Sequence, residues 1–173
     1  GATGGVGSIS VMILSKLGYK VTAVTGKKNK NDFLKELGAS TIMDRKELDV
    51  ESRPLDKGLW DGVVDTAGGK ILAKAISHTK PNGIVAACGL ASDYKLNTTV
   101  MPFIIRGVKL WGIDSVMISN KRRKFLWSQI ANLVDFNILE KYTTIIGLEE
   151  LLNIFPLMLK GETSGKILVD LKK

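Results

Sequence analysis

The sequence of 173 residues contains one cysteine, Cys88, and one histidine, His78. A single cysteine excludes a disulfide within the chain and fits a reducing compartment, so we expect a cytoplasmic protein. One histidine and one cysteine are too few for a zinc site of the usual His/Cys kind, and we expect no metal. No apolar run reaches the length of a membrane-spanning helix, so we expect no membrane partner.

Acidic residues are outnumbered by basic ones, 17 to 25, and the formal net charge is +8. Such a charge is compatible with nucleic acid, a membrane surface or an anionic ligand as a partner. The basic residues are scattered, except for short runs at residues 27–30 and 121–124. Because no zinc finger, RNA-recognition motif or aromatic-basic interleaving accompanies them, we expect no nucleic-acid partner.

The strongest positive signal is the opening stretch Gly1-Ala2-Thr3-Gly4-Gly5-Val6-Gly7. Its pattern Ala2-x-Gly4-x-x-Gly7 is a dinucleotide-binding fingerprint with alanine in the first glycine position. The following residues predict a helix over 8–17 that ends at Gly18, and then a strand over 20–24. In such a unit the glycines let backbone N–H groups approach a pyrophosphate at the helix N-terminus. The alternative is an ordinary tight turn.

Strands and helices alternate further along the chain, which predicts an α/β fold with a Rossmann doubly wound parallel sheet. The expected strands are 41–43, 62–66, 83–89, 109–113, 142–146 and 166–171, and the expected helices are 32–37, 71–78, 102–106, 120–136 and 148–160. Residues 81–83 predict a turn. The fingerprint of a Rossmann fold follows a central strand, and nothing precedes Gly1, so we expect this chain to be part of a longer protein.

The end of the second strand predicts the choice of dinucleotide. NAD-binding folds usually place an acid there on the ribose hydroxyls. Here the residues are Thr25, Gly26 and Lys27, and Arg45 follows the third strand. A lysine or arginine pairs with a 2′-phosphate, so we expect NADPH rather than NADH. The alternative is that the lysines only solvate a loop.

The carboxyl ends of the later strands carry small residues that could lie against a flat ring, among them Thr66, Cys88 and Gly89. Asp65 and Asp114 at strand ends are candidate general acids or bases, or caps of the next helix. We expect Cys88 to be a buried small residue rather than a nucleophile, and His78 to be a residue of a helix C-terminus.

The opening stretch resembles the start of the cofactor domain in zinc-free medium-chain dehydrogenases/reductases. Further blocks resemble one branch, the acrylyl-CoA reductases and YhdH-type quinone oxidoreductases. These blocks are 52–55 with Trp60, 65–69, 86–91, 98–104, 106–108 and 112–117. The resemblance spans nearly the whole chain.

This resemblance implies reduction of an activated carbon–carbon double bond, typically in acrylyl-CoA, by NADPH without metal. It implies that Thr3, Gly4, Gly5 and Val6 hold the pyrophosphate of the cofactor. The 2′-phosphate would be held by Thr25-Gly26-Lys27 and Arg45. The nicotinamide side would be lined by Leu90, Ile104 and Ser115. Lys27 departs from the arginine of the family and loses its planar fork. With the residues taken from the fingerprint and the strand ends, the expected cofactor-binding set is Ala2, Thr3, Gly4, Gly5, Val6, Gly7, Thr25, Gly26, Lys27, Arg45, Thr66, Cys88, Gly89, Leu90, Ile104 and Ser115. No catalytic residue is assigned.

The resemblance also implies a domain organisation. Residues 1–140 would form the NADP-binding Rossmann domain, and residues 141–173 would complete a GroES-like catalytic domain. Strand 109–113 should be a sheet edge, and the family often dimerises there, so we expect a homodimer near Trp111. The alternatives are an NADPH quinone oxidoreductase, a zinc-free alcohol dehydrogenase-like enzyme and a non-enzymatic NADPH-binding protein.

Overall fold

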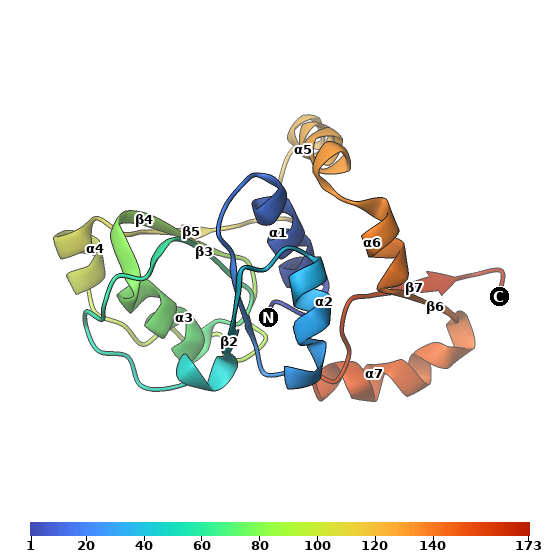
Figure 1. Cartoon of the computed structure of the whole chain (residues 1–173), viewed down its shortest axis with the longest axis horizontal. Helices are drawn as coiled ribbons and strands as arrows, with labels where there is room; N and C mark the ends of the chain where they lie inside the picture. The colour runs from blue at the N-terminus through green and yellow to red at the C-terminus, as the bar shows by residue number, and fades with distance from the viewer. The chain divides into compact units, whose positions relative to one another are not determined.

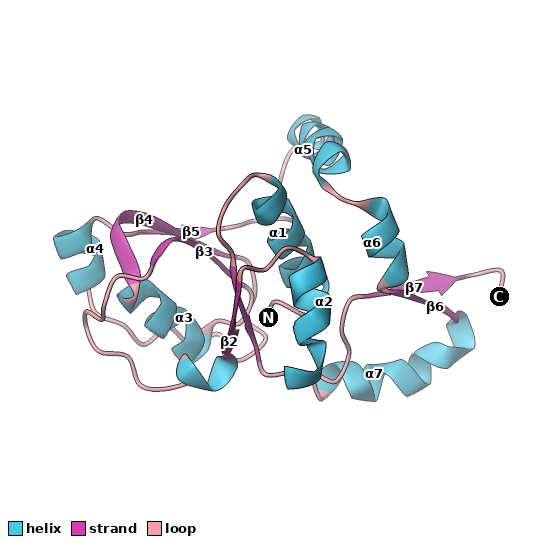
Figure 2. Cartoon of the chain, in the orientation of Figure 1, coloured by secondary structure: helices cyan, strands magenta, loops and turns pink.

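The computed structural model describes all residues, 1–173, and confirms the predicted alternation of strands and helices (Figure 1). The strands, magenta in Figure 2, are β1 (Thr22–Thr25), β2 (Thr41–Asp44), β3 (Trp60–Asp65), β4 (Thr79–Ala87), β5 (Lys109–Gly112), β6 (Thr143–Gly147) and β7 (Lys166–Asp170). The α-helices are α1 (Gly5–Lys16), α2 (Asn31–Glu36), α3 (Gly69–Ser77), α4 (Met101–Arg106), α5 (Asn120–Leu133), α6 (Phe136–Lys141) and α7 (Leu151–Leu159). Short 3₁₀ helices are η1 (Lys28–Lys30), η2 (Arg45–Glu47) and η3 (Leu148–Glu150).

The chain forms two compact units, each made of several segments. Unit 1 contains Gly1, Val24–Gly26 and Met43–Trp127, and unit 2 contains Ala2–Ala23, Lys27–Ile42 and Ser128–Lys173. Strands β1 and β2 form a two-stranded sheet. No helix combines the length and the hydrophobicity that a membrane span requires.

Unit 1 is built on a parallel sheet with the order β3-β4-β5. Strand β5 lies at the edge, as predicted, and pairs only with β4. Helix α3 covers the sheet because its apolar residues recur on one side, and Leu72 and Ile76 pack with Val85 of β4 and with Val108. In register, Asp65 lies opposite Ala87, and Ala87 opposite Gly112. The carboxyl ends of the three parallel strands therefore lie level with one another.

The sequence predicts a turn at residues 81–83 and a strand that starts at residue 83. In the structure, residues 81–83 are part of β4, so the predicted strand start is wrong. Strand β4 begins at Thr79, and its register against β3 shifts between Trp60 and Gly62. Asn82 has a φ of 61° within this irregularity. A Cβ on Gly83 would lie 2.8 Å from the carbonyl oxygen of Asp61, so the extra residues bulge where only glycine allows the close approach.

In unit 2, helices α1 and α2 both end at glycines with positive φ, as the sequence predicts. After α1, Gly18 has a φ of 86°, and the Tyr19 N–H donates to the Leu14 carbonyl at 3.0 Å. Helix α2 ends in the same way at Gly38. Helix α1 itself begins at Gly5, three residues before the predicted start. Its residues Gly5 to Gly7 are thus helical, and the turn proper is shorter than the glycine pattern indicates.

The core of unit 2 joins α1 and α2 to residues from the distant C-terminal segment. Met12 of α1 and Phe33 of α2 are buried, and Tyr142 packs against this cluster. The ring centroids of Phe33 and Tyr142 are 4.3 Å apart. Lys141 donates to Glu36 at 2.7 Å, and the Tyr142 hydroxyl donates to the same carboxylate. The early helices and the C-terminal segment therefore share one hydrophobic core.

The helix predicted over 120–136 is present as α5, but it ends at Leu133, and a second helix that was not predicted, α6, begins at Phe136. Helix α5 ends at Leu133, and the Asp135 carboxylate accepts from the N–H groups of Asn137 and Ile138 at 3.0 and 3.3 Å. Asp135 is thus the N-cap of α6, and an aspartate before an apolar run is a signal that the sequence already contains. Likewise, the helix predicted over 148–160 divides into η3 and α7.

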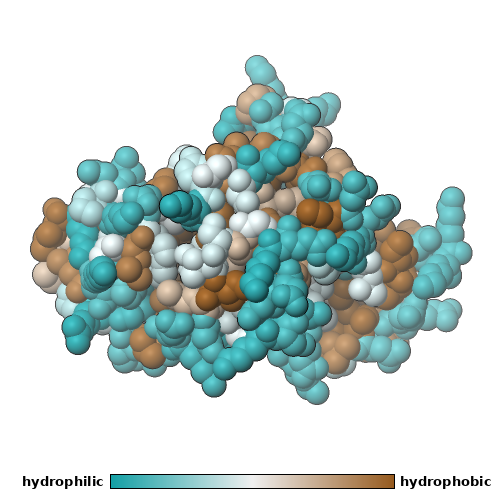
Figure 3. All heavy atoms as spheres, viewed as in Figure 1, coloured by the Kyte–Doolittle hydropathy of each residue, from teal (hydrophilic) through white to brown (hydrophobic).

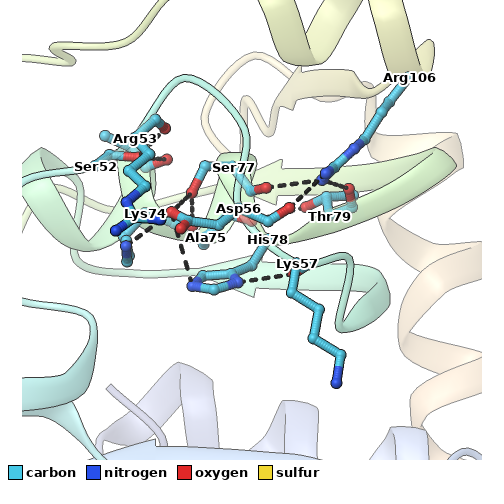
Figure 4. Close-up of polar contacts among 11 residues, drawn as sticks. Ser52, Arg53, Asp56, Lys57, Lys74, Ala75, Ser77, His78, Thr79 and Arg106 are labelled. Atoms are coloured by element: carbon cyan, nitrogen blue, oxygen red, sulfur yellow. Dashed lines mark hydrogen bonds and ion pairs between the residues drawn. The ribbon is translucent and has the colours of Figure 1, made fainter.

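A cluster of polar side chains ties a loop of unit 1 to α3, β4 and α4 (Figure 4). The Asp56 carboxylate accepts from Lys74 Nζ at 2.7 Å and from Ser77 Oγ at 2.9 Å, and the Lys74 and Asp56 side chains are each 12% exposed. Arg106, at the end of α4, donates to the carbonyls of Ser77 and Asp56. Burial alone would raise the pKa of the Asp56 carboxyl, but the hydrogen bonds from Lys74 and Ser77 outweigh it and lower this pKa.

We expect Asp56→Asn to lower the free energy of unfolding by about 2 kcal/mol at neutral pH, because it leaves the Lys74 ammonium without its carboxylate. The effect should depend on pH. A lowered folded-state pKa stabilises the protein above about pH 4, and this contribution is lost as the pH falls through the folded pKa. Urea unfolding at pH 7, 5 and 3 measures both quantities.

The matched control is Asp61→Asn, which removes an ion pair with Lys80 whose side chains are 43% and 85% exposed. It should change the free energy of unfolding by less than about 0.5 kcal/mol. Equal effects of the two substitutions, or an Asp56→Asn effect that persists at pH 3, would contradict the prediction.

Candidate functional site

The glycine-rich turn leads into α1 in unit 2 without any side-chain cap. Gly4 is the N-cap, with extended backbone at φ −82° and ψ 174°, and the first turn of α1 contains no acidic residue. Ala2 and Thr3 are buried, whereas Val6 is 57% exposed. The N–H groups of this helix terminus are therefore not capped by side chains, and its partial positive charge is not offset by an acid.

A lysine far along the chain adds a cation to this turn. A Cβ on Gly5 would lie 3.2 Å from Nζ of Lys166, and the Gly165 N–H donates to the Thr3 carbonyl at 2.9 Å. Sequence reasoning missed Lys166, because nothing in its local sequence points to residue 5. An uncapped helix N-terminus beside an ammonium fits a pyrophosphate.

At the ends of β1 and β2, unit 1 brings two predicted residues together. A Cβ on Gly26 would lie 3.7 Å from Nε and 3.8 Å from Cζ of Arg45. Arg45 is exposed, and Thr25, the residue before Gly26, is 6% exposed. The guanidinium thus lies against backbone that has no side chain, an arrangement that fits the 2′-phosphate expected there.

Lys27, predicted to bind the same phosphate, has a partner within unit 2. Its ammonium donates to the carbonyl of Thr163. Burial, and then the positive charge of Lys30, lower the pKa of Lys27. The sequence did not predict this contact, which anchors the loop before β7.

The level ends of β3, β4 and β5 border a cavity of about 500 Å³. Three of the residues predicted from the strand ends and the resemblance, Cys88, Gly89 and Leu90, line it. Thr66 does not line the cavity, but its carbonyl packs against the lining residue Gly89, where a Cβ would lie 2.5 Å from the Thr66 carbonyl oxygen. The remaining predicted residues on this side do not line it: Ile104 is 74% exposed on α4, and Ser115 follows the lining residue Asp114.

The two candidate acid–base residues both cap turns. The Asp65 carboxylate is 4% exposed and accepts from the Gly68 N–H at 2.9 Å, and burial raises its pKa. The Asp114 carboxylate accepts from the N–H groups of Met117 and Val116, which lower its pKa. Of the two roles left open by the sequence, the geometry favours capping, although the capped N–H groups belong to the turn after each strand rather than to a helix.

Cys88 is exposed, so the expectation that it is buried is wrong. The reason is that it lies one residue past the end of β4, where the sheet no longer covers it. Its thiol donates to the Asp65 carbonyl at 3.3 Å, and burial and then the Asp65 charge raise its pKa, which keeps it protonated at neutral pH. His78 directly follows α3, as predicted, and its Nδ1 lies 2.9 Å from the Lys57 carbonyl oxygen.

Residues 5–132 match the family model described as zinc-binding dehydrogenase. The chain belongs to this family. It contains no group of three or more His, Cys, Asp and Glu residues that could hold a metal ion, so the residues present do not fit the zinc of the family's name.

Within this family, the chain is similar to two curated acrylyl-CoA reductases. The chain is 44% identical over 169 residues to a probable acrylyl-CoA reductase, AcuI, of Escherichia coli, and 42% identical over 171 residues to acrylyl-CoA reductase AcuI of Ruegeria pomeroyi. Each alignment covers 98% of this chain and 52% of the relative. The chain thus spans about half the length of these relatives.

The structure superposes on the yhdH oxidoreductase of Salmonella enterica in complex with NADP with a TM-score of 0.96 and 43% identity, covering 99% of this chain and 52% of the other. For Escherichia coli YhdH with bound NADPH the TM-score is 0.93, with 45% identity and coverage of 98% and 52%. The predicted fold class and the resemblance to this branch of medium-chain dehydrogenases/reductases are confirmed.

We expect Gly89→Ala to lower the free energy of unfolding by about 1–3 kcal/mol, because the new methyl group meets the Thr66 carbonyl and forces the ends of β3 and β4 apart. Gly112→Ala is the matched control, since Gly112 lines the same cavity and its Cβ would have nothing within 4 Å. Urea unfolding of both variants measures the difference. Equal stabilities would mean that the strand ends are not packed as closely as described.

Proposed function

We propose that the full-length protein is an NADPH-dependent oxidoreductase that reduces the activated carbon–carbon double bond of an acrylyl-CoA-like enoyl thioester. The observation that carries this proposal is the match over 99% of the chain with an oxidoreductase crystallised with NADP. The names of the two acrylyl-CoA reductases support the substrate class. When bound, NADPH supplies the hydride; the chain's own residues bind and orient it.

The proposed cofactor contacts follow the charges and the close approaches described above. The backbone of Thr3 to Val6 and the α1 N-terminus would hold the pyrophosphate, with Lys166 as an added cation. Arg45 beside Gly26 would hold the 2′-phosphate. Leu90, in the wall of the cavity, would lie on the nicotinamide side, together with Ile104 and Ser115.

We further propose that residues 1–140 are the cofactor-binding domain and that residues 141–173 complete a catalytic domain. No catalytic residue is assigned within this chain, because the carboxylates of Asp65 and Asp114 are occupied by the turns that they cap.

Quinone reduction is a second candidate function. The chain is 39% identical over 173 residues to the putative quinone oxidoreductase YhfP of Bacillus subtilis, of which it covers 52%. The same cofactor residues would serve both reactions, so the substrate, rather than the fold, distinguishes them.

We expect the full-length protein to oxidise NADPH with acrylyl-CoA faster than with a quinone, and to prefer NADPH over NADH by roughly 10- to 100-fold in kcat/KM. Arg45→Gln should remove most of this preference, because the guanidinium lies against Gly26 where the 2′-phosphate is expected. Arg45 is a cleaner site for this test than Lys27, which also holds the Thr163 carbonyl. Initial rates with both cofactors and both acceptors measure these effects.

The matched control is Lys46→Gln, which removes an exposed cation from the next position and should leave the preference unchanged. Equal kcat/KM values of the wild-type protein with NADPH and NADH would contradict the assignment of Arg45 to the 2′-phosphate. NADPH binding without transfer to either acceptor would favour a non-enzymatic NADPH-binding protein.

We also propose a homodimer formed across β5. All four residues of this edge strand are exposed, and Trp111 is 63% exposed. An exposed, partly apolar edge strand favours pairing with another strand.

We expect Trp111→Lys to convert the dimer to a monomer, because a lysine on the edge opposes strand pairing. Tyr19→Lys is the matched control, since Tyr19 is also 63% exposed but lies outside the sheet edge. Light scattering at high protein concentration measures the molar mass. A monomeric wild type, or a Trp111→Lys dimer, would show that β5 is not the interface.

A further inference from the structure

The ionisable side chains that line the cavity at the ends of β3, β4 and β5 are two carboxylates and one ammonium. Asp93 and Asp114 line it, but the Asp93 carboxylate accepts from the Lys95 N–H at 3.1 Å and the Asp114 carboxylate caps the following turn. Lys95 also lines the cavity, and its Nζ lies 5.8 Å from the ring centroid of Tyr94. Both acids are therefore held by backbone groups, while a lysine and an aromatic ring face the same space.

The basic run at residues 121–124 is hydrogen-bonded to the segment that follows the cavity-lining residue Asp114. Arg123 donates from Nη2 to the carbonyls of Ser115 and Val116 at 3.0 and 3.3 Å, directly after the lining residue Asp114. Arg123 is partly buried by this contact, whereas the three other basic residues are exposed. The start of α5 thus has a defined place beside the cavity.

The exposed side chains around this start form what we call the α5 basic patch: Lys121, Arg122, Lys124, Phe125 and Trp127. Arg122 lies over the Phe125 ring at 5.3 Å from its centroid, and Trp127 is 64% exposed. No acidic residue lies in the first turn of α5. These cations oppose the dipole of their own helix, so an anionic ligand would remove an unfavourable arrangement.

We propose that the α5 basic patch binds the phosphorylated nucleotide portion of a coenzyme A thioester whose acyl end enters the cavity beside Lys95. The inference rests on the proposed function and gives its substrate class a recognition site in this chain. The phosphates of coenzyme A match the three exposed cations, and exposed aromatic rings can stack on its adenine. A quinone offers neither group, so the patch distinguishes the two candidate substrates.

The test compares the full-length protein with the combined variant Lys121→Gln, Arg122→Gln and Lys124→Gln, which leaves the Arg123 contact intact. Free coenzyme A is the binding probe, by calorimetry in the presence of NADP. Acrylyl-CoA and acrylyl-pantetheine, which lacks the nucleotide, are the kinetic probes. We expect the coenzyme A Kd and the acrylyl-CoA KM to rise about 10-fold, with kcat, the acrylyl-pantetheine KM and the NADPH Kd unchanged.

The matched control combines Lys16→Gln, Lys20→Gln and Lys35→Gln, three exposed lysines of unit 2 that carry the same total charge. It should leave all five quantities unchanged. An unchanged coenzyme A Kd in the α5 variant, an equal loss in the control, or an equal loss for acrylyl-pantetheine or NADPH would overturn the proposal.

The coenzyme A binding measurement tests the α5 basic patch independently of whether the protein reduces acrylyl-CoA. If acrylyl-CoA is not reduced, the function fails, but coenzyme A binding that the α5 variant weakens still supports the patch. If acrylyl-CoA is reduced with the same KM by the wild type and the variant, the function stands and the patch is overturned. Raising the salt concentration should weaken coenzyme A binding more in the wild type than in the α5 variant.

Discussion

Parallel pairing of β3, β4 and β5 is the constraint on which the cavity depends. Parallel strands need a crossover between them, and α3 provides it from β3 to β4. All three strands consequently run in the same direction, and the register places Asp65, Ala87 and Gly112 level with one another. The loops that follow leave the sheet at one edge, where their residues surround a common space.

The closeness of these loops explains where glycine occurs in them. At Gly89 and at Gly68, a Cβ would overlap the carbonyl groups of Thr66 and Asp93 respectively. Gly68 also has a φ of 71°, and the Asp65 carboxylate holds its N–H. Larger side chains would separate the loops and change the cavity wall, so these glycines serve the shape of the site rather than flexibility.

Part of the net positive charge is concentrated at a few sites. Cations lie at three places suited to anions: Lys166 at the α1 turn, Arg45 beside Gly26, and the α5 basic patch. The carboxylates beside the cavity, by contrast, accept backbone N–H groups. We propose that the protein binds a phosphorylated cofactor and a phosphorylated substrate, and positive potential both attracts and orients such polyanions.

The sequence by itself determined the features that depend on neighbouring residues. The helix ends at Gly18 and Gly38 follow from the backbone freedom of glycine, and the alternation of strands and helices follows from local hydrophobic patterns and predicted the α/β class. Even the break before α6 has a local signal, because Asp135 precedes an apolar run and caps the helix. Local rules also indicated which strand ends carry small residues.

Only the tertiary structure decided which distant residues meet. The approach of Lys166 to Gly5, the contact of Lys27 with Thr163 and the shifted register of β4 join residues whose own neighbours in the sequence say nothing of each other. The exposure of Cys88 likewise depends on where the sheet stops covering it. Such contacts are set by the packing of whole elements around a shared core, and a single sequence read along its length does not encode that packing in any local pattern.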